Sequence, residues 1–155
     1  MNTPLVYKET QIFHILIIFM MAFLAGFVAL LNFGTGTYVS FNSLLGVIVL
    51  FVGIIALFFN FTIKIDEAFL TLSFGIGLIK VKYPLKNITA QTITQEKIPG
   101  WIGLGIRLAP GGRLVYNTKP GKAVCFNTFT GKLRVCIVSN TPDALENILK
   151  ERSAL

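Results

Sequence analysis

The chain has 155 residues, of which 54% are hydrophobic and 14% are charged, and its formal net charge is +7. Soluble domains carry about 25% charged residues, so this composition excludes an ordinary cytosolic domain. The high apolar content also excludes a disordered chain, because a sequence this rich in apolar residues can bury enough apolar surface to fold.

The charge lies almost entirely in the C-terminal part of the chain. Residues 1–61 contain two charged side chains, Lys8 and Glu9, whereas residues 62–155 hold 13 of the 14 basic and 6 of the 7 acidic residues. The full net charge therefore belongs to residues 62–155. We predict two domains that divide after residue 61, a nearly uncharged transmembrane hairpin and a basic domain.

Two apolar stretches in the first domain have the length of membrane spans. Residues 12–31 contain His14 as their only ionisable side chain, and residues 41–61 contain none. A helix of about 20 residues crosses the roughly 30 Å hydrocarbon core of a bilayer. We predict two spans joined by a short extracytoplasmic loop at 32–43. A secretory signal peptide is the alternative for the first stretch, but its apolar region would be too long.

Basic residues flank the predicted spans on one side of the membrane. Lys8 precedes the first span and Lys64 follows the second, while the connecting loop carries no charge. The positive-inside rule therefore places both termini in the cytoplasm and the protein in the inner (cytoplasmic) membrane. His14 lies near the cytoplasmic end of its span, where we expect it to reach interfacial water. A proton or ligand role is the alternative for this residue.

After residue 60 the pattern changes from continuous apolar residues to alternating ones, which predicts half-buried strands. Turn residues separate the alternating segments from one another. The predicted strands cover residues 61–66, 69–74, 78–83, 87–95, 113–117, 122–127 and 132–139.

A two-residue turn at 130–131 fixes the register of the last hairpin, in which paired residue numbers sum to 261. This register places Cys125 opposite Cys136 on one face and Phe126 opposite Val135 on the other. Because the domain is predicted in a reducing compartment, we expect both cysteines to be core thiols. Redox sensing is the less favoured alternative. The absence of a nearby histidine argues against a zinc site.

The last segment predicts an amphipathic helix. Thr141 suits the N-cap and Pro142 the first helical position, and Leu145, Ile148 and Leu149 share one face. This face must pack on the apolar side of the strands. We therefore expect a small antiparallel barrel or sandwich of about seven strands with a C-terminal capping helix.

The order of these motifs resembles the bacterial pleckstrin-homology-like (PH-like) membrane proteins. The most specific matching residues are Trp101, Gly103, Gly105, Ile106 and Arg107, the pair Tyr116-Asn117, and the helix start Thr141-Pro142-Asp143. These proteins join a two-span hairpin to a cytoplasmic PH-like domain. The resemblance therefore implies an α+β membrane protein. It supplies no catalytic residue, and the members are largely of unknown function.

The sequence offers little for catalysis. Its one histidine, His14, lies in the first predicted span, and Glu96 is the only acid between residues 68 and 142, so a pair of catalytic carboxylates is missing. No glycine-rich phosphate-binding loop is present. We expect neither an enzyme nor a cofactor or metal site.

The basic excess of the second domain is the strongest functional signal. Anionic headgroups attract suitably placed basic residues by about 1 kcal/mol each. The alternative is that the charge only reinforces topology and solubility. A nucleic-acid partner is not expected, because no recognition motif accompanies the charge. The glycine-rich loop 101–113 is either a barrel corner or a ligand rim with Trp101 as an aromatic anchor and Arg107 as an anion contact. A position of Trp101 at the membrane interface is a further alternative. The candidate interaction surface is Lys80, Lys82, Trp101, Arg107, Arg113, Lys132 and Arg134.

These observations predict a non-enzymatic integral membrane protein. Its basic PH-like domain would bind anionic phospholipid headgroups or a protein partner at the inner leaflet. The alternative is a small accessory or regulatory subunit of a larger membrane protein complex, or a self-associating protein, recognised through the hairpin. Small residues allow close helix approach. The candidate helix-packing residues are Ala22, Gly26, Ala29, Gly46 and Gly53.

Overall fold

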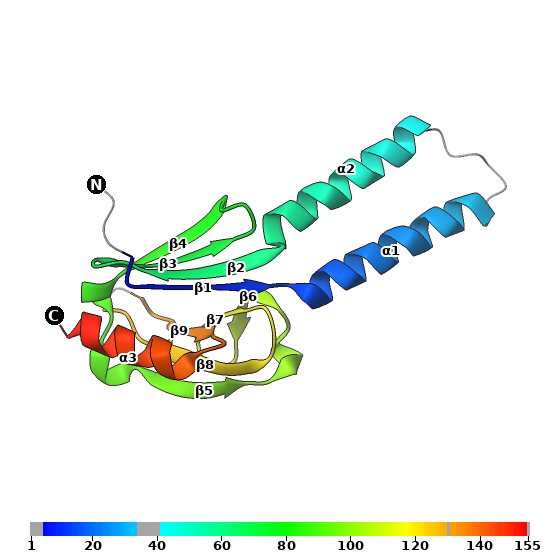
Figure 1. The fold of residues 1–155 in the computed structure, drawn as a ribbon. Coiled ribbons are helices and arrows are strands. Elements are labelled where there is room, and N and C mark those ends of the chain that lie inside the picture. Colours follow the sequence, from blue (N-terminus) through cyan, green and yellow to red (C-terminus); the bar gives the residue numbers. More distant parts are fainter. Residues whose placement is uncertain (1–4, 34–40, 130, 155) are drawn as a thin grey trace.

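The computed structural model describes residues 5–33, 41–129 and 131–154, with the backbone alone at 31–33 and 41. The described residues form nine strands in two sheets, two long helices and a C-terminal helix. The long helices, α1 (His14–Phe33) and α2 (Phe41–Phe58), leave the sheets side by side from one end (Figure 1).

The first sheet is antiparallel throughout, in the order β1-β2-β3-β4. Its strands are β1 (Tyr7–Ile12), β2 (Asn60–Ile65), β3 (Phe69–Phe74) and β4 (Ile79–Pro84). The alternation expected for β2 is present, because Phe61, Ile63 and Ile65 are fully buried in the core. Residues 7–12, which the composition grouped with the apolar segment, pair with β2 as the edge strand.

The second sheet has the order β5-β8-β9-β7-β6. Its strands are β5 (Thr94–Ile98), β6 (Gly105–Ala109), β7 (Arg113–Asn117), β8 (Gly121–Phe126) and β9 (Arg134–Val138). The predicted hairpin register is confirmed, since Cys125 pairs with Cys136 and Phe126 with Val135. Its turn includes Thr130, which lies outside the described residues. β7 runs parallel to β9, so the predicted all-antiparallel barrel is wrong.

The C-terminal helix α3 (Pro142–Ser153) packs on the core through Leu145 and Leu149, both fully buried. Pro142 occupies the first helical position as predicted. Thr141 is the N-cap residue as predicted, but its side chain makes no capping hydrogen bond, and its hydroxyl instead lies 2.7 Å from the Tyr7 hydroxyl. The helix start is thus tied to β1.

Within the described residues, no helix combines the length and the apolar character needed to cross a membrane.

By this finding the predicted transmembrane hairpin, with spans at 12–31 and 41–61, is wrong. The predictions that two spans anchor the chain in a membrane and that it is a multi-pass inner-membrane protein are wrong for the same reason. At both inner ends, residues assigned to the predicted spans belong to strands instead: Ile12 ends β1, and the chain leaves α2 at Phe58 to enter β2 at Asn60. The predicted loop at 32–43 lies mostly outside the described residues.

A glycine fixes α2 against the first sheet. Gly75, in the turn between β3 and β4, has a φ of 55°, a conformation that favours glycine. A Cβ at this position would collide with the backbone carbonyl of Leu57 in α2. The next residue, Ile76, donates its N–H to the Ala56 carbonyl at 3.1 Å. The end of α2 is therefore held directly on the β3–β4 turn.

The two cysteines form a disulfide between β8 and β9. The prediction of free thiols is therefore wrong. It rested on the predicted compartment, whereas the register places the two cysteines directly opposite each other, within bonding distance. Disulfides persist in oxidising environments, so the bond also removes the argument for a reducing one.

A carboxylate on β1 joins the two sheets. Glu9 accepts hydrogen bonds from the Tyr7 hydroxyl at 2.6 Å, from the Gln11 side chain at 2.7 Å and from the Asn140 N–H at 2.6 Å. The Ser139 hydroxyl donates to it as well. Burial raises the pKa of Glu9, but these hydrogen bonds outweigh burial and leave the pKa below its ordinary value of 4.5.

The neighbouring Gln11 extends this connection. It is buried, donates to the Val138 carbonyl at the end of β9 at 2.8 Å, and accepts from the Thr118 hydroxyl at 2.6 Å. Buried polar groups are stable when they are hydrogen-bonded, so these contacts hold β1 against the second sheet.

We expect Glu9→Gln to destabilise the fold at neutral pH and to flatten its acid dependence. A group whose pKa is lowered by folding contributes stability above its unfolded pKa, and this stability is lost as the pH falls through the folded pKa. The wild-type free energy of unfolding should therefore decrease below about pH 4.5. Loss of hydrogen bonds to a charged group should cost about 1.5–3 kcal/mol at pH 7.

Urea unfolding between pH 3 and pH 7 measures both effects. Glu67→Gln, the same change at an exposed turn position, is the matched control and should follow the wild type. If the free energy of unfolding depended on pH equally steeply in the wild type and in Glu9→Gln, the role of Glu9 would be contradicted.

Candidate functional site

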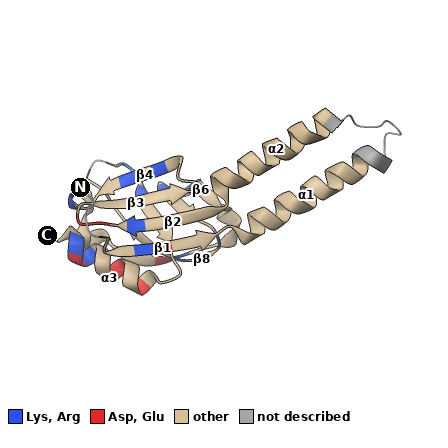
Figure 2. Cartoon of the chain, turned by 45° about the horizontal axis from the view of Figure 1, so that its top comes forward, with Lys and Arg blue, Asp and Glu red and all other residues tan. Residues whose placement is uncertain are grey.

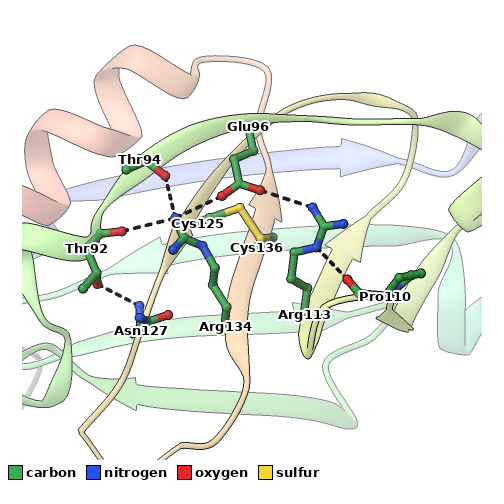
Figure 3. The surroundings of a disulfide bond; sticks show 9 residues. All are labelled: Thr92, Thr94, Glu96, Pro110, Arg113, Cys125, Asn127, Arg134 and Cys136. Carbon is green, nitrogen blue, oxygen red and sulfur yellow. Dashed lines mark hydrogen bonds and ion pairs between the residues drawn. A yellow bond between two sulfur atoms is a disulfide. The ribbon is translucent and has the colours of Figure 1, made fainter.

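Two of the predicted interaction residues are engaged inside the structure. Glu96 on β5 lies 3.3 Å from Arg113 on β7 and 3.0 Å from Arg134 on β9, across the disulfide (Figure 3). Arg134 also donates to the Thr94 hydroxyl at 2.6 Å. Glu96 thus links the edge strand β5 to the two inner strands β7 and β9. Both arginines are therefore paired with an acid of the same chain.

Three others lie on separate parts of the second sheet and its loops. Trp101 is 73% exposed on the short turn Gly100–Ile102 after β5, Arg107 is exposed on β6, and Lys132 is exposed between β8 and β9. They share no element with each other.

The remaining two, Lys80 and Lys82, lie exposed on β4. Following the strand register from Lys82 leads through Thr71 on β3 to Lys64 on β2 and then to Lys8 on β1. All three lysines in this cross-strand row are exposed. Figure 2 shows the basic segments on β1, β2 and β4 side by side. We call this surface the lysine face, made of Lys8, Lys64, Lys80 and Lys82.

The lysine face has an unbalanced charge. Lys8 is the direct cross-strand partner of Lys64, and directly opposed like charges destabilise a sheet by about 0.2–1 kcal/mol. None of the ion pairs among the described residues includes a lysine of this face. Asp66, in the turn at the end of β2, accepts hydrogen bonds from the backbone N–H groups of Ala68 and Phe69, at 2.9 and 2.7 Å.

Hydroxyl groups fill the face between the lysines. The next cross-strand row joins Lys80 through Ser73 and Thr62 to Thr10, and the two threonine hydroxyls lie 3.2 Å apart. Ammonium and hydroxyl groups together are donors suited to carboxylate or phosphate oxygens. The face therefore presents a set of hydrogen-bond donors of the kind that an anion accepts from.

Sequence patterns missed half of this face. Lys8 and Lys64 were used only as topology signals, and residues 7–12 were not assigned to a strand. The available signal was the alternation of Lys8 and Thr10 with Tyr7, Glu9 and Gln11, which is typical of a half-buried strand.

A group that resembles a metal site does not fit a metal. Among the described residues, ligand atoms of Glu96, Cys125 and Cys136 lie within 4.8 Å of one another. The disulfide, however, uses both sulfurs, and the two arginines occupy the carboxylate. Metal binding requires thiolates and a free carboxylate.

The buried Tyr116 and the half-buried Tyr83 form another polar pair. The Tyr83 and Tyr116 hydroxyls lie 2.8 Å apart, and burial raises the pKa of both. Neither therefore supplies a phenolate near neutral pH, and the pair closes a hydrogen bond within the core.

The predicted helix-packing residues face outward. Ala22, Gly26 and Ala29 are exposed on α1, as are Gly46 and Gly53 on α2. A Cβ added at any of the three glycines would meet nothing within 4 Å. The contact between the helices instead includes the stacked rings of Phe23 and Phe51, 5.8 Å apart. His14 is exposed at the start of α1.

The resemblance to the bacterial PH-like membrane proteins is wrong by two findings. The described chain begins with strand β1, not with a hairpin of spans, and its second sheet contains a parallel pair. Comparison with protein-family models, curated proteins and solved structures found no match to this chain.

Proposed function

We propose that the chain is a non-enzymatic binding protein that recognises an acidic protein partner through the lysine face. The observation that carries this proposal is the direct pairing of Lys8 with Lys64 and the lack of an acid opposite them. The repulsion within the free protein becomes an attraction once a carboxylate lies between the two ammonium groups.

The chemistry of the face favours carboxylates over other anions. Single-stranded nucleic acid needs aromatic platforms for base stacking. Within the described part of the chain, the aromatic ring found against these lysines is Phe69, which lies 5.8 Å from the Lys82 ammonium and so is engaged in a cation–π contact. An anionic lipid surface gains about 1 kcal/mol for each of the four lysines, which corresponds to millimolar affinity. Carboxylates on an extended chain recur on one face and so match the two lysine rows, and each exposed ion pair adds about 0.2–1 kcal/mol.

The test is a binding titration of the full chain with a fluorescent peptide of alternating glutamate and threonine. In an extended peptide the carboxylates share one face, which matches the lysine rows. Lys8→Gln/Lys64→Gln should weaken binding at least tenfold, and its free energy of unfolding should rise by up to about 1 kcal/mol because the like-charge pair is gone.

Lys119→Gln/Lys132→Gln removes the same charge at exposed positions off this face and is the matched control, with an expected change below twofold. An equal loss in the control would contradict the proposal, because net charge alone would then explain binding. Tighter binding to phosphatidylglycerol vesicles or to single-stranded DNA than to the peptide would identify a different class of partner.

A second function is favoured by the open glycine positions. Exposed apolar side chains cover α1 and α2, and contiguous apolar surface of this kind marks interaction sites. A Cβ added at Gly26, Gly46 or Gly53 would meet nothing within 4 Å, so the backbone at these positions is open to close approach by a helix of another protein. We propose on this ground an accessory subunit recognised through the two helices.

Purification of the full chain in a mild detergent tests the subunit proposal. A protein that co-purifies in fixed stoichiometry should be lost in Gly46→Leu/Gly53→Leu and retained in Val49→Leu/Val52→Leu, a control at exposed positions of the same helix. Retention in both variants, or the absence of any stoichiometric protein, would contradict it.

A further inference from the structure

An apolar groove lies where the two long helices meet the sheets. It has a volume of about 680 Å³, within the range of small-molecule sites. Its walls come from α1, α2, the start of β4 and the segment that enters β6. They include Leu16, Phe19, Ile54, Phe58 and Leu104. The groove is separate from the lysine face, which lies on the outer side of the first sheet.

One charged side chain, Arg107, stands among these apolar walls. Its Nε–H donates to the Leu104 carbonyl at 2.9 Å, which holds the guanidinium at the groove. No carboxylate among the described residues forms an ion pair with it. The remaining N–H groups of the guanidinium have the fork geometry that matches a carboxylate or phosphate.

The backbone segment beside Arg107 is held in place by a side chain of β7. The buried Asn117 donates its side-chain amide to the Gly103 carbonyl at 2.8 Å. Gly103 and Gly105 both have positive φ values, 86° and 94°, so the backbone turns sharply on either side of Leu104. This turn brings an apolar wall residue and the arginine to the same groove, and it is fixed before any ligand arrives.

We infer that this groove binds an anionic amphipath, a molecule with one apolar chain and a carboxylate or phosphate head. The chain lies along the apolar walls from α1 and α2, and the head accepts hydrogen bonds from Arg107. Charge complementarity selects an anion, and a single unpaired cation among apolar residues selects a molecule that is charged at one end. This inference is independent of the acidic partner proposed for the lysine face.

The experiment is a displacement assay on the full chain. Dansylaminoundecanoate, whose fluorescence rises in apolar sites, is the bound probe, and dodecanoate, dodecyl phosphate and dodecanol are the competitors. Dodecanoate and dodecyl phosphate should displace the probe at least tenfold more effectively than the neutral dodecanol. The stronger of the two anions distinguishes a carboxylate head from a phosphate head.

Variants locate the site. Arg107→Gln should weaken dodecanoate binding about tenfold and leave dodecanol binding unchanged, whereas Lys119→Gln and Lys132→Gln, which remove a charge at exposed positions elsewhere, should change neither. Leu104→Trp should fill the groove and weaken all competitors, and Ile106→Trp serves this purpose if the first variant does not fold by circular dichroism. Equal binding of dodecanoate and dodecanol, or unchanged binding in Arg107→Gln, would overturn the inference. Binding that survives the groove-filling change would place the probe on the exposed helices and would also overturn it.

Discussion

The pairing of β1 with β2 is the constraint on which the rest of the structure depends. β1 runs directly into α1, α2 runs directly into β2, and the register joins Ile12 to Asn60 at the end where the helices begin. The two helices must therefore leave side by side from one end of the sheet (Figure 1). The same strand carries Glu9 and Gln11, whose hydrogen bonds reach the end of β9 and join the two sheets.

Both proposed sites follow from this pairing. It places Lys8 opposite Lys64, which creates the like-charge pair on the outer face. It also fixes the position of Phe13, which lies between β1 and α1 in the chain and is buried, with its ring 6.2 Å from that of Phe74. Phe13 lines the groove at the helices. The outer face is polar and donor-rich, whereas the groove is apolar with one cation, so the two sites suit different chemistry.

Local patterns predicted the elements whose contacts are near in sequence. The β8–β9 register followed from a short hairpin, and α3 followed from Pro142 and the spacing of Leu145 and Leu149. Features set by distant contacts were missed: β1 is short and polar and precedes a long apolar stretch, and β7 reaches β9 across the hairpin. Half of the lysine face and the ion pairs of Glu96 could not be predicted, because they depend on which strands become neighbours.

Cross-linking of the first two strands tests the central claim most directly. Thr10→Cys/Thr62→Cys places two cysteines at directly paired positions, whereas Thr10→Cys/Lys64→Cys places them two residues out of register. Directly opposite residues meet the distance limits of a disulfide, and diagonal ones do not. Under mild oxidation, peptide mass spectrometry should find the new disulfide in the first variant and not in the second. If the new disulfide between β1 and β2 formed in neither variant, or formed in equal yield in both, the β1–β2 register would be contradicted, and with it the account of both sites.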